Sequence, residues 1–142
     1  LPGTDGRKMS KSYGNYVLMT ESPESIRQKI MPMMTDPARM RRTDPGDPEK
    51  CPVFDFHRTF SSQEDKSWVV EGCTSAGIGC VDCKKKLLQH MLPVIEPLHQ
   101  KRVELESNLD YVKEVLYEGS RSARCLAQET MEAVRTAMNL KY

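Results

Sequence analysis

The feature that most constrains the fold is a long run of apolar residues at helical spacing in the second half of the chain. Between positions 81 and 105, apolar residues recur at Val81, Leu87, Leu88, Met91, Leu92, Ile95, Leu98, Val103 and Leu105. Such spacing predicts one amphipathic helix of about 25 residues. We expect Pro93 and Pro97 to kink this helix, because each lacks a backbone hydrogen-bond donor.

Three shorter helices are expected before the long one. Ser22, Pro23 and Glu24 are typical of a helix start, with a capping hydroxyl, a proline and an acid in the first turn. Apolar spacing extends this first helix to about Thr35. Residues 36–52 are rich in proline and charge and are predicted to form a connector, followed by short helices over 53–60 and 63–72.

The C-terminal part is predicted to contain two further helices. Asn108 should cap the first of them, with Gly119 as its stop, and Ser120 should cap a second one that runs through Met138. Strand signals are almost absent after Val17. The sequence therefore predicts an all-α fold, a helical bundle preceded by an irregular loop over residues 1–16.

Composition limits the kinds of function that can be argued from charge. The formal net charge is only +1, so a nucleic-acid role has to depend on local basic clusters. Three such clusters are Arg39 with Arg41 and Arg42, Lys84 with Lys85 and Lys86, and Lys101 with Arg102. Each alone is equally typical of a solvated surface. No apolar run approaches the length of a membrane span and no signal peptide is recognisable, so a cytoplasmic protein is expected.

Residues 8–12 read Lys-Met-Ser-Lys-Ser, within the longer string GRKMSKSYGN. Two ammonium groups three residues apart on a flexible loop can close over a triphosphate, and hydroxyls and backbone amides add donors. Negative charge develops on pyrophosphate as it leaves. Positive charge placed beside it stabilises the transition state, which raises the reaction rate and does not merely tighten binding. Residues 8–12 can therefore form a triphosphate-binding loop, whereas a polar segment of lysines and serines without such a role is the alternative.

The string resembles the second signature of class I aminoacyl-tRNA synthetases, and the surrounding residues resemble the bacterial-type tryptophanyl enzymes in particular. In that family a helix opening with a Ser-Pro-Glu start follows the loop, and a helical anticodon-binding domain comes next. Ser22, Pro23 and Glu24 followed by a helical remainder match this order. The resemblance implies that residues 1–20 end the catalytic domain and that residues 21–142 form a helical tRNA anticodon-binding domain.

The resemblance also implies an activity for the complete enzyme. Such enzymes activate tryptophan with ATP and Mg²⁺ to an adenylate, release pyrophosphate and transfer tryptophan to tRNA(Trp), as homodimers. The resemblance implies that Lys8 and Lys11 are the catalytic groups of an ATP-binding loop made of Lys8, Met9, Ser10, Lys11 and Ser12. The nucleotide-binding fold and the first signature of the family are absent from this chain. We therefore expect the chain to be the C-terminal part of a tryptophan–tRNA ligase, and to be inactive alone.

Four of the five cysteines lie in a pattern that suggests a metal site. Cys73, Cys80 and Cys83 surround a glycine-rich turn, and Cys51 lies in the connector before them. Four thiolates can hold tetrahedral zinc or a 4Fe-4S cluster, and the spacing suits both. Small buried core cysteines are the alternative. Cys125, in the predicted last helix, is interpreted as structural.

A subset of tryptophanyl-tRNA synthetases is similar in this region and carries a four-cysteine 4Fe-4S motif, which favours the cluster over zinc. The centre would tie down an irregular region and fix Lys84, Lys85 and Lys86 for contacts with tRNA phosphates. Two other hypotheses stay open: a free-standing iron-sulfur or zinc module with an accidental KMSKS string, and a tRNA-binding paralogue without a catalytic half. The ordered match over residues 6–25 argues against the first hypothesis, and the intact signature loop argues against the second.

Overall fold

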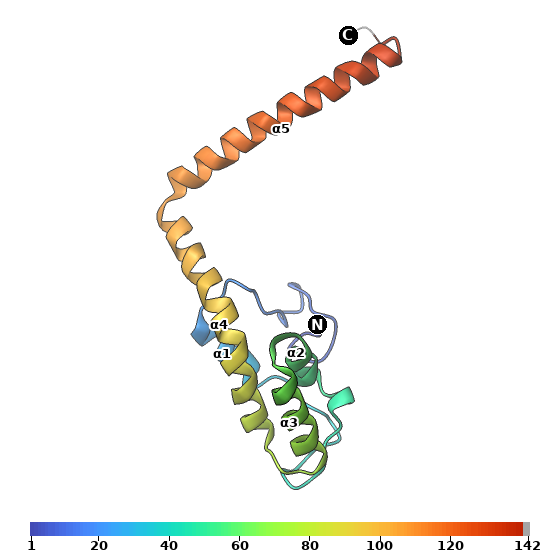
Figure 1. The fold of residues 1–142 in the computed structure, drawn as a ribbon, viewed down its shortest axis with the longest axis vertical. Coiled ribbons are helices and arrows are strands. Elements are labelled where there is room, and N and C mark those ends of the chain that lie inside the picture. The colour runs from blue at the N-terminus through green and yellow to red at the C-terminus, as the bar shows by residue number, and fades with distance from the viewer. Residues whose placement is uncertain (141–142) are drawn as a thin grey trace. The chain divides into compact units, whose positions relative to one another are not determined.

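The computed structural model describes residues 1–140, and every regular element in that range is a helix (Figure 1). In chain order these are α1 (Pro23–Ile30), the 3-10 helix η1 (Pro48–Lys50), α2 (Pro52–Phe60), α3 (Gln63–Thr74), α4 (Cys80–Ser107) and α5 (Leu109–Ala137). The predicted all-α class is confirmed. The chain divides into two compact units, Leu1–Gln100 and Lys101–Tyr142.

The helices of the first unit begin where their capping residues predict. The Ser22 hydroxyl accepts a hydrogen bond from the Ser25 amide at 3.2 Å and opens α1. This helix ends at Ile30, earlier than the predicted Thr35, because Pro32 has no amide hydrogen to continue the helical bonds and its ring clashes with a carbonyl of the preceding turn. The predicted helices over 53–60 and 63–72 correspond to α2 and α3, and the predicted long helix corresponds to α4, which contains both prolines.

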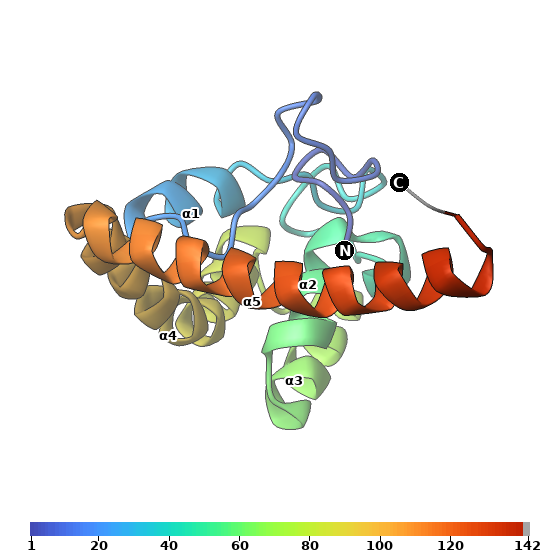
Figure 2. The ribbon, with the colours of Figure 1, turned by 90° about the horizontal axis from the view of Figure 1, so that it is seen from above.

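One apolar core holds the first unit together. It is built from α1 and the turn after it, α2, and the first half of α4, and its members are Ile26, Ile30, Met33, Val53, Phe56, Leu87, Leu88, Met91, Leu92 and Ile95. Met9 and Val17 of the N-terminal loop pack against this core, so the loop is attached to the helical unit. In Figure 2 the N-terminal loop lies on the side of the unit opposite α3.

The second unit contains α5, which differs from the prediction. Asn108 caps it as expected, accepting from the Tyr111 amide at 3.3 Å. The stop expected at Gly119 and the cap expected at Ser120 are wrong, because α5 continues through both positions. One interior glycine costs only about 1 kcal/mol relative to alanine, which strong helix formers on both sides can offset. No described residue of α5 is buried.

Candidate functional site: the signature loop and the cysteine region

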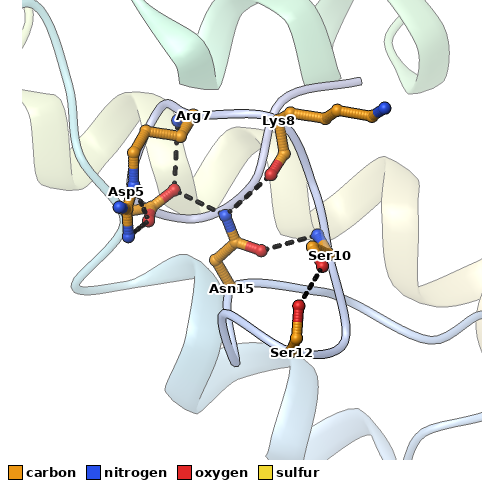
Figure 3. Close-up of polar contacts among 6 residues, drawn as sticks. All are labelled: Asp5, Arg7, Lys8, Ser10, Ser12 and Asn15. Atoms are coloured by element: carbon orange, nitrogen blue, oxygen red, sulfur yellow. Dashed lines mark hydrogen bonds and ion pairs between the residues drawn. The ribbon is translucent and has the colours of Figure 1, made fainter.

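Asn15 organises the signature loop from within (Figure 3). Its side chain is 3% exposed and lies at the centre of the loop. Asn15 Oδ1 accepts from the Ser10 amide at 2.8 Å, while Asn15 Nδ2 donates to the Lys8 carbonyl at 3.1 Å and to Asp5 Oδ1 at 2.7 Å. A Cβ atom at Gly3 would lie 2.2 Å from Asn15 Nδ2, so only glycine leaves room for this side chain.

Asp5 connects Asn15 to the loop segment that precedes the signature. Its carboxylate accepts from the Arg7 amide at 3.0 Å and from Arg7 Nε at 2.8 Å. The hydrogen bond from Asn15 and those from Arg7 favour the ionised form and lower the pKa of Asp5 to about 2. Asp5 is therefore a carboxylate at neutral pH, and it fixes the donor orientation of the Asn15 amide.

The groups expected to bind phosphate lie on the outside of this loop. Lys8 and Lys11 are exposed, and in Figure 3 the Lys8 side chain points away from Asn15. The hydroxyls of Ser10 and Ser12 are 2.8 Å apart, which places both on the same turn. Met9 instead packs against the apolar core and anchors the string. The loop thus presents two ammonium groups from a backbone that is held internally.

The role of Asn15 and Asp5 was not predicted. An asparagine directly after a glycine in a polar loop is a common turn residue, and nothing in the sequence marks it as buried. The only signal was that the string YGN follows the signature closely enough to fold back on it.

The four predicted ligand cysteines lie at the ends of three helices. Cys51 precedes α2, Cys73 is in the last turn of α3, and Cys80 and Cys83 are in the first turn of α4. All four thiols are free and partly buried, whereas Cys125 is exposed. Exposure of Cys125 does not fit the packed structural role expected for it. Among the described residues, no three side chains of His, Cys, Asp or Glu lie close enough together to bind a metal ion as they stand.

The four thiols nevertheless interact with one another electrostatically. Burial first, and then interaction with the other three cysteines, raise the pKa of Cys83 to about 12. Burial likewise raises the pKa of Cys73, an effect that the Arg39 guanidinium opposes from 3.8 Å. These sulfur atoms are therefore near enough to repel one another when ionised, and all lie in one region of the first unit.

His57 is a neighbour of this region that was not predicted as a site residue. The ring is fully buried, and burial lowers the pKa of His57 to about 4, so it is neutral at pH 7. One ring nitrogen lies 2.7 Å from Ser61 Oγ, and the other lies 3.2 Å from the Cys83 carbonyl oxygen and 3.3 Å from its sulfur. His57 thus holds the first turn of α4 against α2.

The lysines expected to bind tRNA occupy three different environments. Lys84 is buried, and its ammonium donates to the carbonyls of Met31 and Met33 at 2.8 and 2.5 Å. Lys86 forms an ion pair with Asp65 at 2.8 Å, which with further hydrogen bonds lowers the pKa of that carboxyl to about 2. Of these three lysines, only Lys85 is exposed. The expected exposed basic turn is therefore not formed, and Lys84 is not accessible to a phosphate.

Comparison with known proteins identifies the family of the chain. The model of the family described as tRNA synthetases class I (W and Y) matches residues 1–94, which include the signature loop and all four candidate ligand cysteines. The chain belongs to this family. Residues 8–12 lie within this match, which argues against the hypothesis of a free-standing module with an accidental KMSKS string.

Among individual relatives, the chain is similar to tryptophan–tRNA ligases. It is 52% identical over 143 residues to the ligase of Thermotoga maritima, covering all of this chain and 44% of that protein. It is 50% identical over 141 residues to the ligase of Aquifex aeolicus, covering 99% of this chain and 36% of that protein. The chain thus spans less than half the length of these relatives.

A solved structure supports the arrangement of the elements. The tryptophanyl-tRNA synthetase of Campylobacter jejuni, crystallised with ADP and tryptophan, matches with a TM-score of 0.82 at 29% identity, over 98% of this chain and 43% of that one. No helix within residues 1–140 is long and apolar enough to cross a membrane.

Proposed function

We propose that this chain supplies the ATP-binding signature loop and the tRNA anticodon-binding domain of a tryptophan–tRNA ligase. The observation that carries the proposal is the loop itself: Lys8 and Lys11 are exposed on a backbone that Asn15 holds from inside. Similarity along the whole chain to tryptophan–tRNA ligases supports the choice of amino acid. In this proposal residues 1–20 end the catalytic domain and residues 21–142 bind tRNA(Trp).

The reaction explains why two cations are needed on this loop. The carboxylate of tryptophan attacks the α-phosphorus of ATP, and the bond to pyrophosphate breaks, giving tryptophanyl adenylate. A ribose hydroxyl at the tRNA end then attacks the adenylate carbonyl, and AMP leaves. Lys8 and Lys11, together with the Mg²⁺ that accompanies ATP, would offset the negative charge that grows on the leaving pyrophosphate.

The cysteine region fits a metal centre by its chemistry. Cys51, Cys73, Cys80 and Cys83 are free, partly buried and electrostatically coupled, and the cations of Arg39 and Lys84 lie beside them. We propose that they hold a 4Fe-4S cluster, with zinc as the alternative. Such a centre would supply structural cross-linking of α2, α3 and α4. The thiols must lose their protons and move closer together on binding it.

The remaining parts of the proposal concern the partners and the setting. Lys85 and Lys86 remain candidates for contacts with tRNA phosphates, whereas the burial of Lys84 gives it a structural role. We propose that the complete enzyme acts as a homodimer in the cytoplasm.

The test is made in the complete synthetase that contains this chain. Lys11→Ala should lower the rate of tryptophan-dependent pyrophosphate exchange at least 100-fold while leaving tryptophan affinity within about threefold, because the charge acts in the transition state. The matched control is Lys101→Ala, which removes a lysine outside the loop. Equal rates for the two variants would contradict the assigned role. The 142-residue chain alone should show no exchange.

A further inference from the structure

A groove of about 400 Å³ lies beside the cysteine region. Residues 39–42 of the connector form one wall, and residues 79–82 at the start of α4 form the other. None of these residues belongs to the signature loop or to the lysine cluster. Cys80 lies in the groove lining, so the groove adjoins the proposed metal centre directly.

Charge in the groove is predominantly positive. Arg39, Arg41 and Arg42 line it against a single carboxylate, that of Asp82. Arg41 and Arg42 are exposed, and among residues 1–140 neither guanidinium has an ion-pair partner. The Arg41 amide donates to Asp44 Oδ2 at 2.7 Å, so the turn that carries them is fixed. Two unpaired guanidinium groups on a fixed turn favour a phosphate.

The groove also has apolar surface of the kind that a base can cover. Met40 is 83% exposed and Val81 is 52% exposed, one on each wall. Guanidinium planes and apolar side chains together bind an unstacked base, while the charges bind its phosphate. A bare inorganic anion would use the charges and leave the apolar surface uncovered.

Arg39 ties the two walls together. The side chain is only 9% exposed, and its Nη2 donates to the carbonyls of Arg42 at 2.9 Å and of Ile78 at 2.6 Å. Its Nη1 lies 3.8 Å from Cys73 Sγ. Its Nε is buried without a hydrogen-bond partner in the described part of the chain. The groove is therefore held in shape before any ligand arrives, and through the same side chain it is connected to a cysteine.

We propose that this groove takes up an unstacked, phosphate-bearing nucleotide of the tRNA loop, with Arg41 and Arg42 as its binding residues and Arg39 as the residue that positions them. The inference rests on the proposed role in tRNA binding and names the place where that binding occurs. It also connects the groove to the cysteine region, because a change in the position of Cys73 reaches the groove through Arg39.

The experiment measures RNA binding by the 142-residue chain using fluorescence anisotropy. The probe is a labelled hairpin with the anticodon stem and loop of tRNA(Trp), and the comparison probe is the same stem as a blunt duplex. The double variant Arg41→Gln/Arg42→Gln is compared with Arg58→Gln/Lys66→Gln, which removes two charges from α2 and α3. A third variant, Arg41→Lys/Arg42→Lys, keeps the charge and loses the planar groups. Circular dichroism checks that all variants fold.

The double glutamine variant should bind the hairpin roughly 20- to 100-fold more weakly, and its salt dependence should flatten by about 1 to 1.5 in log–log slope. The control should lose less than about threefold, and the lysine variant should fall between the two. Equal losses in the groove variant and the control, or equal losses for hairpin and duplex, would overturn the groove while leaving tRNA binding intact. If the unmodified chain binds neither probe, the tRNA-binding role itself is wrong, and the groove proposal fails with it.

Discussion

Replacing Asn15 by alanine should inactivate the loop although both lysine side chains are still present. The substitution removes three hydrogen bonds, to the Ser10 amide, the Lys8 carbonyl and the Asp5 carboxylate. A neutral hydrogen bond contributes about 1 kcal/mol and one to a charged group about 1.5–3 kcal/mol. Allowing for water entering the gap, we expect the loop to lose about 3 kcal/mol of organisation, which corresponds to roughly a 100-fold change in an equilibrium or a rate.

The assay is pyrophosphate exchange by the complete synthetase that contains this chain. Asn15→Ala should lower kcat about 100-fold with the KM for tryptophan nearly unchanged, because a disordered loop no longer holds its lysines where charge develops. Asn108→Ala is the matched control, since it removes a capping asparagine from α5 and costs stability but not loop geometry. If Asn15→Ala exchanges within threefold of the control, the internal hydrogen bonds do not set the position of the lysines.

Three further outcomes are expected. Cys83→Ser should abolish metal binding in anaerobically prepared chain, whereas Cys125→Ser should keep full iron and sulfide (or zinc) content by elemental analysis; retention of metal by the first variant would exclude Cys83 as a ligand. The Asp65 carboxyl should titrate near pH 2 by carbon-13 NMR instead of near its ordinary 3.8, because a hydrogen-bonded lysine of α4 lowers its pKa. Since the folded-state pKa is lowered, the stabilisation from Asp65 is present above pH 4 and is lost as pH falls from about 4 to 2. Lys84→Met should lower the free energy of unfolding in urea by about 2–3 kcal/mol, because two carbonyls lose their hydrogen-bond donor. The control Lys85→Met should change this free energy by less than about 0.5 kcal/mol. Equal effects of the two substitutions would show that the buried ammonium contributes nothing specific.

The local parts of the fold were predictable because their signals are local. Ser22 and Asn108 cap helices through their own side chains, and the periodicity of α4 continues through two prolines. The end of α1 was missed because Pro32 was not weighed against the apolar spacing that continues past it. The continuity of α5 was missed because Gly119 was interpreted as a helix end. A glycine ends a helix only where a different backbone conformation is more stable there than the helical one. Nothing lies within 4 Å of a Cβ atom built at Gly119, so no neighbouring segment favours such a conformation.

The environment of the lysine cluster could have been found in the sequence. Lys84 lies three, four and seven residues before Leu87, Leu88 and Met91, on the apolar face of the helix. A run of three lysines suggested a solvated turn, but helical periodicity assigns its first member to the core and only the next to solvent. What the sequence could not supply was the pair of carbonyls that compensates the buried ammonium, because these come from the turn after α1, more than fifty residues earlier.

The contact between Lys84 and the turn after α1 also helps to hold the signature loop and the cysteine region together. The Met34 amide donates to the Thr4 carbonyl at 2.9 Å, which attaches the signature loop to the turn after α1. The same turn receives the Lys84 ammonium from the first turn of α4, beside Cys83. A backbone turn of about four residues is thus bonded on one side to the loop that carries Lys8 and Lys11 and on the other to the helix that carries the cysteines. Since α1 is only eight residues long and would be marginal alone, its packing and these bonds, rather than helix propensity, must hold the turn in place. A substitution that loosens this turn should therefore disturb both regions at once, whereas one confined to either region should leave the other unchanged.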